Sequence, residues 1–191
     1  MTSLSSPVTP VHRTTEELEA ALKLFRSAPA DLGRVELVVA RPAVGERAVL
    51  DEGELSLEHG LVSDNWRTRA GTGNEPSPDR QLNVINARLS GFVAVDPDRR
   101  ALAGDQLHLD LDLSHENLPA GTRLALGSAV IEVTEPPHTG CKKFVARFGQ
   151  DAMRFVNSGT GRRLRLRGLN ARVVVPGTVR PGDEVRKLPA E

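Results

Sequence analysis

The chain has 191 residues, with 25 Lys and Arg against 25 Asp and Glu, so its formal net charge is zero. A hydrophobic fraction of 39% and a charged fraction of 26% are typical of one sizeable globular domain, and exclude a membrane-spanning or wholly disordered chain. The balanced charge and an aromatic content of 3% argue against nucleic-acid coating or base stacking, so we expect no nucleic-acid partner.

The first predicted elements are a lead-in and a helix. Residues 1–13 are rich in Ser, Thr and Pro and predict a flexible lead-in. Thr14 and Glu17 have the spacing of a capping box, and an apolar i, i+3, i+4, i+7 face follows at Leu18, Ala21, Leu22 and Phe25. These features predict an amphipathic helix over 15–27, within an N-terminal helix and linker over 14–33.

The remainder of the chain, 34–191, predicts a mainly β domain. Short apolar or alternating runs predict strands at 34–40, 48–58, 81–85, 106–113, 123–126, 129–134, 172–175 and 184–188. Gly53 indicates two strands, or one bulged strand, within 48–58. Glycine-containing turns between short strands favour a closed or nearly closed barrel. We also expect a loop at 67–80 and a peripheral helix at 150–155.

The histidines and the location of the chain carry weaker signals. His108 stands between Leu107 and Leu109 in an alternating strand, so we expect its side chain on the exposed face. His59 reads as a loop histidine, whereas His115, near Asn117 at a strand end, is a candidate ligand contact. Because no apolar leader or spanning segment is evident, we expect a cytoplasmic protein with no membrane partner.

Basic residues gather in one stretch, residues 141–172. It contains nine basic residues and a single acid, Asp151. Such a run is either a solvated basic face or a pocket for an anionic ligand, since arginine forks match phosphate and carboxylate oxygens.

The lone cysteine, Cys141, begins this stretch and favours the pocket reading. It follows Pro136-Pro137-His138-Thr139-Gly140 and precedes two lysines. Nearby cations favour a thiolate, which is both a nucleophile and a soft metal ligand. A buried structural thiol is the competing reading. His138 and Cys141 lack a second Cys/His pair, so a structural zinc site is not expected. No common nucleotide-binding or hydrolase motif is present in the sequence.

Several segments resemble MOSC domains, the module named for molybdenum cofactor sulfurase. PPHTGCKKFVARFGQDAMRFVNS and LRLRGLNARVVVPGTVRPGDEVRK are similar to the C-terminal part of that family. The run GDQLHLDLDLSHENLPAGTRLALGSAVIEVTE is similar to its centre, and GLVSDNW and RQLNVIN to its upstream part. The resemblance covers about 34–188 and includes Arg147 and Gly149 after the cysteine.

The resemblance implies a β-barrel whose pocket holds, or receives sulfur for, the molybdopterin form of the molybdenum cofactor. It makes Cys141 the catalytic residue, as a molybdenum ligand or a sulfur carrier. Arg147 is the first candidate for contacting the cofactor, with Lys142, Arg80, Asn83, Asn117 and His138 as further candidates. The positively charged recess would lie at the barrel mouth.

Three hypotheses remain open. In the first, the protein is a molybdenum-dependent enzyme that reduces a small N-hydroxylated substrate with electrons from a donor protein. In the second, it carries sulfur received from a cysteine desulfurase; the residues before the barrel are too few for a pyridoxal phosphate domain, so that cofactor would act only through the partner. In the third, the basic stretch binds an anionic ligand without chemistry.

Overall fold

The computed structural model describes residues 11–68 and 76–189. The predicted lead-in at 1–13 lies mostly outside these residues, and so does the centre of the predicted loop at 67–80. The end of that predicted loop, Pro78–Arg80, forms a short 3-10 helix, η1.

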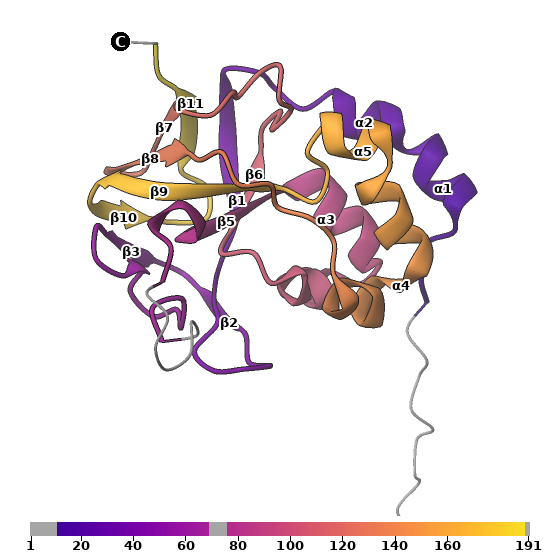
Figure 1. The fold of residues 1–191 in the computed structure, drawn as a ribbon, viewed down its shortest axis with the longest axis horizontal. Helices are drawn as coiled ribbons and strands as arrows, with labels where there is room; N and C mark the ends of the chain where they lie inside the picture. The colour runs from indigo at the N-terminus through magenta and orange to yellow at the C-terminus, as the bar shows by residue number, and fades with distance from the viewer. Residues whose placement is uncertain (1–10, 69–75, 190–191) are drawn as a thin grey trace, which may run out of the picture.

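Within the described residues, strands of one sheet close into a barrel of seven in the order β1-β11-β7-β8-β9-β5-β6 (Figure 1). Pairing of β11 with β1, with Gly33 opposite Val185, closes the ring. All pairs are antiparallel except β5 with β6. The strands are β1 (Leu32–Ala40), β5 (Leu82–Asn86), β6 (Leu107–Asp110), β7 (Arg123–Leu126), β8 (Ala129–Val133), β9 (Leu169–Val175) and β11 (Glu184–Lys187).

Shorter strands flank the barrel. β2 (Ala48–Leu50) pairs with the end of β1, and a small sheet joins β10 (Gly177–Val179), β3 (Gly53–Ser56) and β4 (Gly60–Leu61). The predicted strand at 48–58 is therefore two strands. A Cβ atom at Gly53 would stand 2.8 Å from a Leu61 methyl and 2.9 Å from a Val38 methyl, so the glycine allows this close packing.

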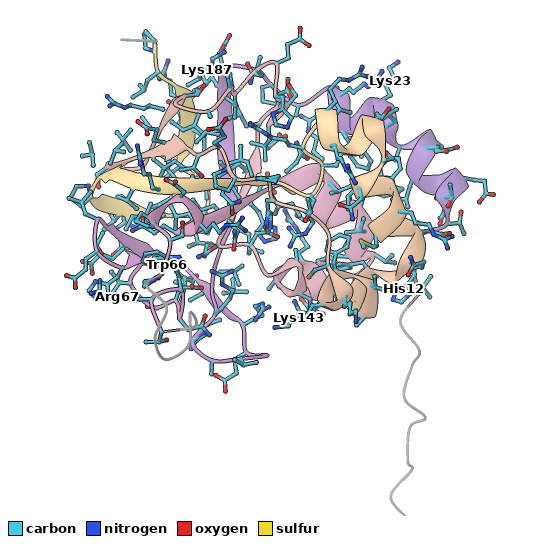
Figure 2. The ribbon with its side chains drawn as sticks, viewed as in Figure 1. His12, Lys23, Trp66, Arg67, Lys143 and Lys187 are labelled. Atoms are coloured by element: carbon cyan, nitrogen blue, oxygen red, sulfur yellow. The ribbon has the colours of Figure 1, made fainter. Side chains whose placement is uncertain are left out.

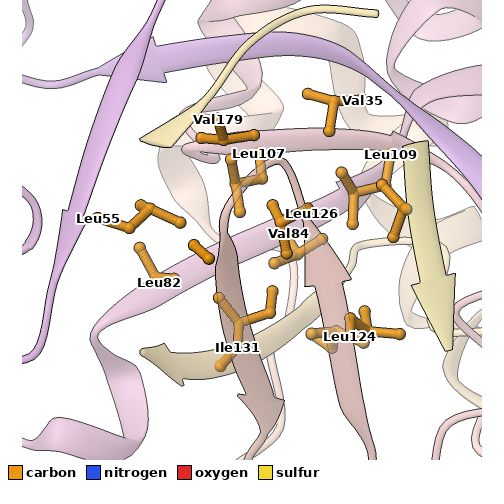
Figure 3. Packing of buried hydrophobic residues seen from close by; sticks show 14 of the residues in the cluster. Val35, Leu55, Leu82, Val84, Leu107, Leu109, Leu124, Leu126, Ile131 and Val179 are labelled. Atoms are coloured by element: carbon orange, nitrogen blue, oxygen red, sulfur yellow. The ribbon is translucent and has the colours of Figure 1, made fainter. Parts of the chain in front are cut away.

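Alternating apolar side chains fill the barrel. Leu82 and Val84 of β5 and Leu107 and Leu109 of β6 point inward, together with residues of the opposite strands such as Leu124 and Ile131 (Figure 3). Burial of these aliphatic side chains is the main stabilising contribution to the barrel. The prediction of a mainly β barrel with peripheral helices is confirmed.

The helices pack against one side of the barrel (Figure 1). They are α1 (Thr15–Ala20), α2 (Leu22–Arg26), α3 (Ala87–Ala94), α4 (Lys142–Asn157), α5 (Gly159–Arg163) and the 3-10 helix η2 (Pro97–Ala103). The predicted helix at 15–27 is confirmed, with a break at Ala21, and both hydrogen bonds of the Thr14–Glu17 capping box are present.

The predicted helix at 150–155 coincides with the second part of α4, which ends at Asn157, whereas the first part, from Lys142, was not predicted. The buried residues of α4 are Phe144 and Phe148 before Gly149, and Ala152 and Val156 after it. Gly149 has a φ of 90°, which is non-helical and divides α4 into two parts. This kink, favoured by glycine, hid the first part of the helix from the periodicity.

A second apolar core lies between these helices and the outer wall of the barrel. It includes Ile85 of β5, Leu89 of α3 and Phe144 of α4. His108 of β6 shares this outer side and is fully buried, so the expectation that it is exposed was wrong. The strand alternates as predicted, but its outer face is covered by α3, where Ser90 Oγ lies 2.8 Å from His108 Nδ1.

Candidate functional site

The thiol of Cys141 is exposed at the start of α4. Cys141 is the N-cap residue of α4. The residue before it, Gly140, is bound by Asn157, the last residue of the same helix. Asn157 Oδ1 accepts a 3.0 Å hydrogen bond from the Gly140 amide. A Cβ atom on Gly140 would stand 2.8 Å from Met153 Sδ, so the loop lies close against α4. The hydrogen bond between Gly140 and Asn157 fixes the backbone next to the cysteine relative to α4.

Cys141 lines a cavity of about 210 Å³, which we call the Cys141 cavity. Its wall is strongly cationic, because basic residues from the loop after β1, from η1, from α4 and from the turn before β9 converge here. Figure 2 labels one of them, Lys143, near the start of α4. The lining residues are Arg41, Arg47, Arg80, Asn83, Ala103, Gly104, His138, Cys141, Lys143, Phe144, Arg147, Arg167 and Asn170.

Two of the cavity's arginines are neutralised by buried carboxylates. Arg41 forms a two-pronged ion pair with Asp64, at 2.7 and 2.8 Å. Arg167 contacts both oxygens of Asp105, at 2.8 and 2.7 Å. Among the described residues, no carboxylate contacts the remaining cations of the wall, which are Arg47, Arg80, Lys143 and Arg147. The cavity therefore carries an excess of positive charge.

Two of these unpaired cations, Arg47 and Arg147, are half-buried. Burial lowers the pKa of Arg147, while the neighbouring Cys141 acts in the opposite direction. Burial and then repulsion from Arg147 lower the pKa of Arg47. Both guanidinium groups lie over Gly104, where a Cβ atom would be 3.0 Å from Arg47 Nη2 and 3.4 Å from Arg147 Nη1. An anion in this cavity would relieve the repulsion between them.

His138 belongs to a buried polar cluster around Asp105. Its Nε2 lies 2.8 Å from Asp105 Oδ1, on the carboxylate that also binds Arg167. Burial alone would raise the pKa of Asp105, but Arg167 and His138 outweigh it and hold the pKa well below its usual value. Burial and then Arg167 lower the pKa of His138. The contact with Asp105 holds the imidazole in one orientation.

Amide side chains form another part of the cavity wall. Asn83 of β5 and Asn170 of β9 are opposite each other in the sheet, and Asn83 Nδ2 donates to Asn170 Oδ1 at 2.7 Å. Their sequence neighbours, including Leu82 and Leu169, point into the barrel core. These two amides therefore lie on the outer wall of the barrel, whereas Arg41, Arg80 and Gly104 of the same cavity lie beside the end of β1 and the starts of β5 and β6. The expectation that the cavity lies at the barrel mouth stays a prediction.

The structure brings together five of the seven predicted site residues: Arg80, Asn83, His138, Cys141 and Arg147 all line the Cys141 cavity. Lys142 does not line it, and the next residue, Lys143, does. Asn117 lies elsewhere, where Nδ2 donates to the carbonyls of Ala30 and Asp112 and Oδ1 accepts from Lys187. This network gives Asn117 a structural role instead of a place in the cavity.

Several cavity residues were not predicted individually. Lys143 and Arg167 belong to the basic stretch, so the sequence shows their charge but not that their side chains line this cavity. Arg41, Arg47 and Asn170 gave no signal in the sequence, because the closure of the barrel alone brings β1 and β9 to this place.

Within residues 11–68 and 76–189, no group of three or more His, Cys, Asp and Glu side chains is arranged to hold a metal ion. In the same part of the chain, no helix is long and apolar enough to cross a membrane.

Comparisons with known proteins agree with the fold. The YUAD protein from Bacillus subtilis is similar in structure, with a TM-score of 0.60 at 16% identity over 84% of this chain and 97% of that chain. YiiM from Escherichia coli gives a TM-score of 0.53 at 22% identity, over 83% of this chain and 71% of that chain. A search of curated proteins found no match. The family model of the MOSC domain matches residues 78–186, more than half of the chain, and the protein therefore belongs to the MOSC domain family.

Proposed function

We propose that the Cys141 cavity receives the molybdenum cofactor, and that the thiolate of Cys141 binds its molybdenum or carries sulfur for it. One observation supports this most: the lone, exposed thiol of the chain lies in a cavity whose wall carries four cations without carboxylate partners among the described residues. The MOSC family's association with molybdenum cofactor sulfurase supplies the identity of the ligand.

The residues present fit such a cofactor. A phosphate needs guanidinium or ammonium donors, and Arg47 Nε is a buried donor with no hydrogen-bond partner in the described residues. A pterin ring needs amide partners, and Asn83 and Asn170 line the cavity beside the cations. Their amides also bind each other, Arg41 and the Pro136 carbonyl, so a pterin would use their remaining donor and acceptor positions. A thiolate is a soft ligand, which suits molybdenum, whereas hard metals prefer oxygen ligands.

We assign the parts as follows. Cys141 would contact the molybdenum, and Arg147, Arg47, Arg80 and Lys143 would contact the phosphate, with Asn83 and Asn170 against the pterin. When bound, the cofactor supplies two-electron redox chemistry, suited to reducing small N-hydroxylated compounds in the cytoplasm with electrons from a partner protein. His138, oriented by Asp105, would line this site with its imidazole ring.

The sulfur-carrier alternative uses the same thiolate. Cys141 Sγ attacks the outer sulfur of a persulfide on a cysteine desulfurase, a new S–S bond forms on Cys141, and the donor's S–S bond breaks. The donor cysteine leaves as a thiolate, so the exchange needs no external oxidant or reductant. Nearby Arg147 would stabilise the negative charge of the Cys141 persulfide.

Molybdenum content tests the first form of the proposal. We expect protein produced in a molybdate-supplied host to contain molybdenum by elemental analysis, and Cys141→Ala to contain none. Arg163→Gln is the matched control, because Arg163 is an exposed arginine that does not line the cavity. Equal molybdenum in the wild type and Cys141→Ala would contradict binding through the thiol.

Mass spectrometry tests the sulfur-carrier form. After incubation with a cysteine desulfurase and cysteine, we expect the wild type to gain about 32 daltons, one sulfur atom, and Cys141→Ser to gain nothing. Because Cys141 is the only cysteine, the adduct has one possible site. If the protein gains neither molybdenum nor sulfur, both forms of the proposal are rejected and the hypothesis of anion binding without chemistry replaces them.

A further inference from the structure

Another cavity, of about 280 Å³, shares only His138 and Arg167 with the Cys141 cavity. We call it the Arg165 cavity. Cys141 does not line it. Its wall is formed by the loop before Cys141, the end of α4, α5 and the turn into β9. The lining residues are His115, Thr134, Glu135, Pro136, Pro137, His138, Thr139, Val156, Asn157, Gly161, Arg162, Arg165, Arg167, Gly168 and Leu169.

The charge of this wall is positive and mostly uncompensated. Arg167 is paired with Asp105, but among the described residues no carboxylate contacts Arg162 or Arg165. Glu135 is the acid in the wall; it is exposed and has no ion pair in that part of the chain. Two guanidinium groups are therefore available to an anion.

Arg165 is the least expected of these charges, because its residue is only 9% exposed. Within the described residues its side chain donates one hydrogen bond, from Nη1 to the carbonyl of Leu118. Burial lowers the pKa of Arg165, and Arg165 in turn contributes to the lowered pKa of His115, after burial. Burying a cation without a counter-charge costs free energy, which a bound anion offsets.

The backbone fixes Arg165 in this position. Its φ of 46° lies in the left-handed region, which residues with a side chain rarely adopt. Two hydrogen bonds hold the turn: Leu166 N to Gly161 O at 2.9 Å, and Gly168 N to Arg165 O at 2.8 Å. Such strained positions are concentrated at binding sites, where the surrounding structure maintains them.

We propose that the Arg165 cavity binds the phosphate group of a small metabolite, separately from the thiol chemistry at Cys141. Two unpaired guanidinium groups match a doubly charged tetrahedral anion better than a carboxylate, which carries one charge. The volume of about 280 Å³ is enough for the phosphate and a small organic part.

Titration with inorganic phosphate, followed by NMR of the cofactor-free protein, tests the proposal. We expect saturable shifts of the Gly161 amide and of the His115 ring, at lower concentration than with acetate. Cys141→Ser should give the same shifts, because Cys141 does not line this cavity. Shifts confined to Gly104 and Phe144, which line only the Cys141 cavity, would overturn the proposal.

A pair of arginine variants provides the second arm. Arg162 and Arg163 are adjacent and exposed on α5, but only Arg162 lines the cavity. We expect Arg162→Gln to weaken phosphate binding about tenfold and Arg163→Gln to leave it unchanged. Equal effects of the two variants would show binding to a diffuse basic surface and overturn the assignment. Because both residues are exposed, neither change threatens the fold.

Discussion

The buried His108 makes folding sensitive to mild acid. Burial lowers its pKa to about 4 from 6.5, so at neutral pH the ring is uncharged in the folded protein. Between pH 6.5 and 4, His108 binds a proton in the unfolded chain but not in the folded protein. We therefore expect this residue to contribute stability that is complete above pH 6.5 and falls by about 3 kcal/mol as the pH drops to 4.

Urea unfolding at a series of pH values measures this contribution. The free energy of unfolding of the wild type should fall more steeply between pH 6.5 and 4 than that of His108→Gln, which has no proton to gain. His59→Gln is the matched control, because His59 is an exposed histidine and should leave the slope unchanged. Parallel curves for wild type and His108→Gln would show that His108 titrates normally in the folded protein.

Single residues also show where sequence reasoning reached its limit. Cys141 was identifiable from its basic neighbours, and the structure places it in a cationic cavity. The alternation that put His108 opposite the leucines was right, but alternation does not tell whether the second face meets solvent or a helix. Asn117 was predicted to contact a ligand because it is a polar residue near a strand end. Polar residues at such positions also hold loops together, and this is the role of Asn117 in the structure.

Among the elements, the turn that leads into β9 depends on a glycine. Gly168 has a φ of 111°, and a Cβ atom there would stand 2.0 Å from the carbonyl oxygen of Val84 on β5. The substitution Gly168→Ala therefore adds a steric clash to backbone strain. We expect a loss of about 3 kcal/mol or more in the free energy of unfolding.

Gly182→Ala is the matched comparison. Gly182 has a similar φ of 96°, but a Cβ atom there meets no atom within 4 Å, so only backbone strain applies. We expect it to cost about 1 kcal/mol in the same urea experiment. If both variants lose the same free energy, the close approach of Gly168 to β5 is not important for stability.

The elements that sequence reasoning found were those with a regular local pattern. β6 alternates, and α1 has a complete capping box, so both were predicted. α3 was missed because it follows β5 directly with no turn residues between them, although Asn86 is a good N-cap that accepts hydrogen bonds from Arg88 N and Leu89 N. η2 and the first part of α4 carry glycine, proline or charged residues that are typical of loops.

At the scale of the whole molecule, a net charge of zero conceals a strong separation of charge. The basic stretch at 141–172 divides between two cavities: Lys143 and Arg147 line the Cys141 cavity, and Arg162 and Arg165 line the Arg165 cavity. Arg167 lines both and is held by Asp105. Sequence reasoning predicted the excess of positive charge, but only the path of the chain around the barrel divides it.

The remaining cations of the Cys141 cavity come from distant parts of the chain. Arg41 and Arg47 follow β1, which pairs with β6 and β11 in the closed sheet. Their position beside Cys141 depends on barrel closure, a long-range property that no local pattern encodes. The family resemblance identified the chemistry of the thiol but not these partners.

The central claim, that a reachable thiol sits in an anion-attracting cavity, is tested most directly by alkylation of Cys141. The measured quantity is the ratio of its reaction rates with iodoacetate, an anion, and iodoacetamide, which is neutral. The ratio is independent of how much of the thiol is ionised, and the single cysteine makes the product unambiguous in a mass spectrum. We predict a ratio about tenfold or more above that of free cysteine at low salt, decreasing as salt is added. It should also fall in Arg147→Gln but not in the control Arg163→Gln. A ratio equal to that of free cysteine at every salt concentration would contradict the account.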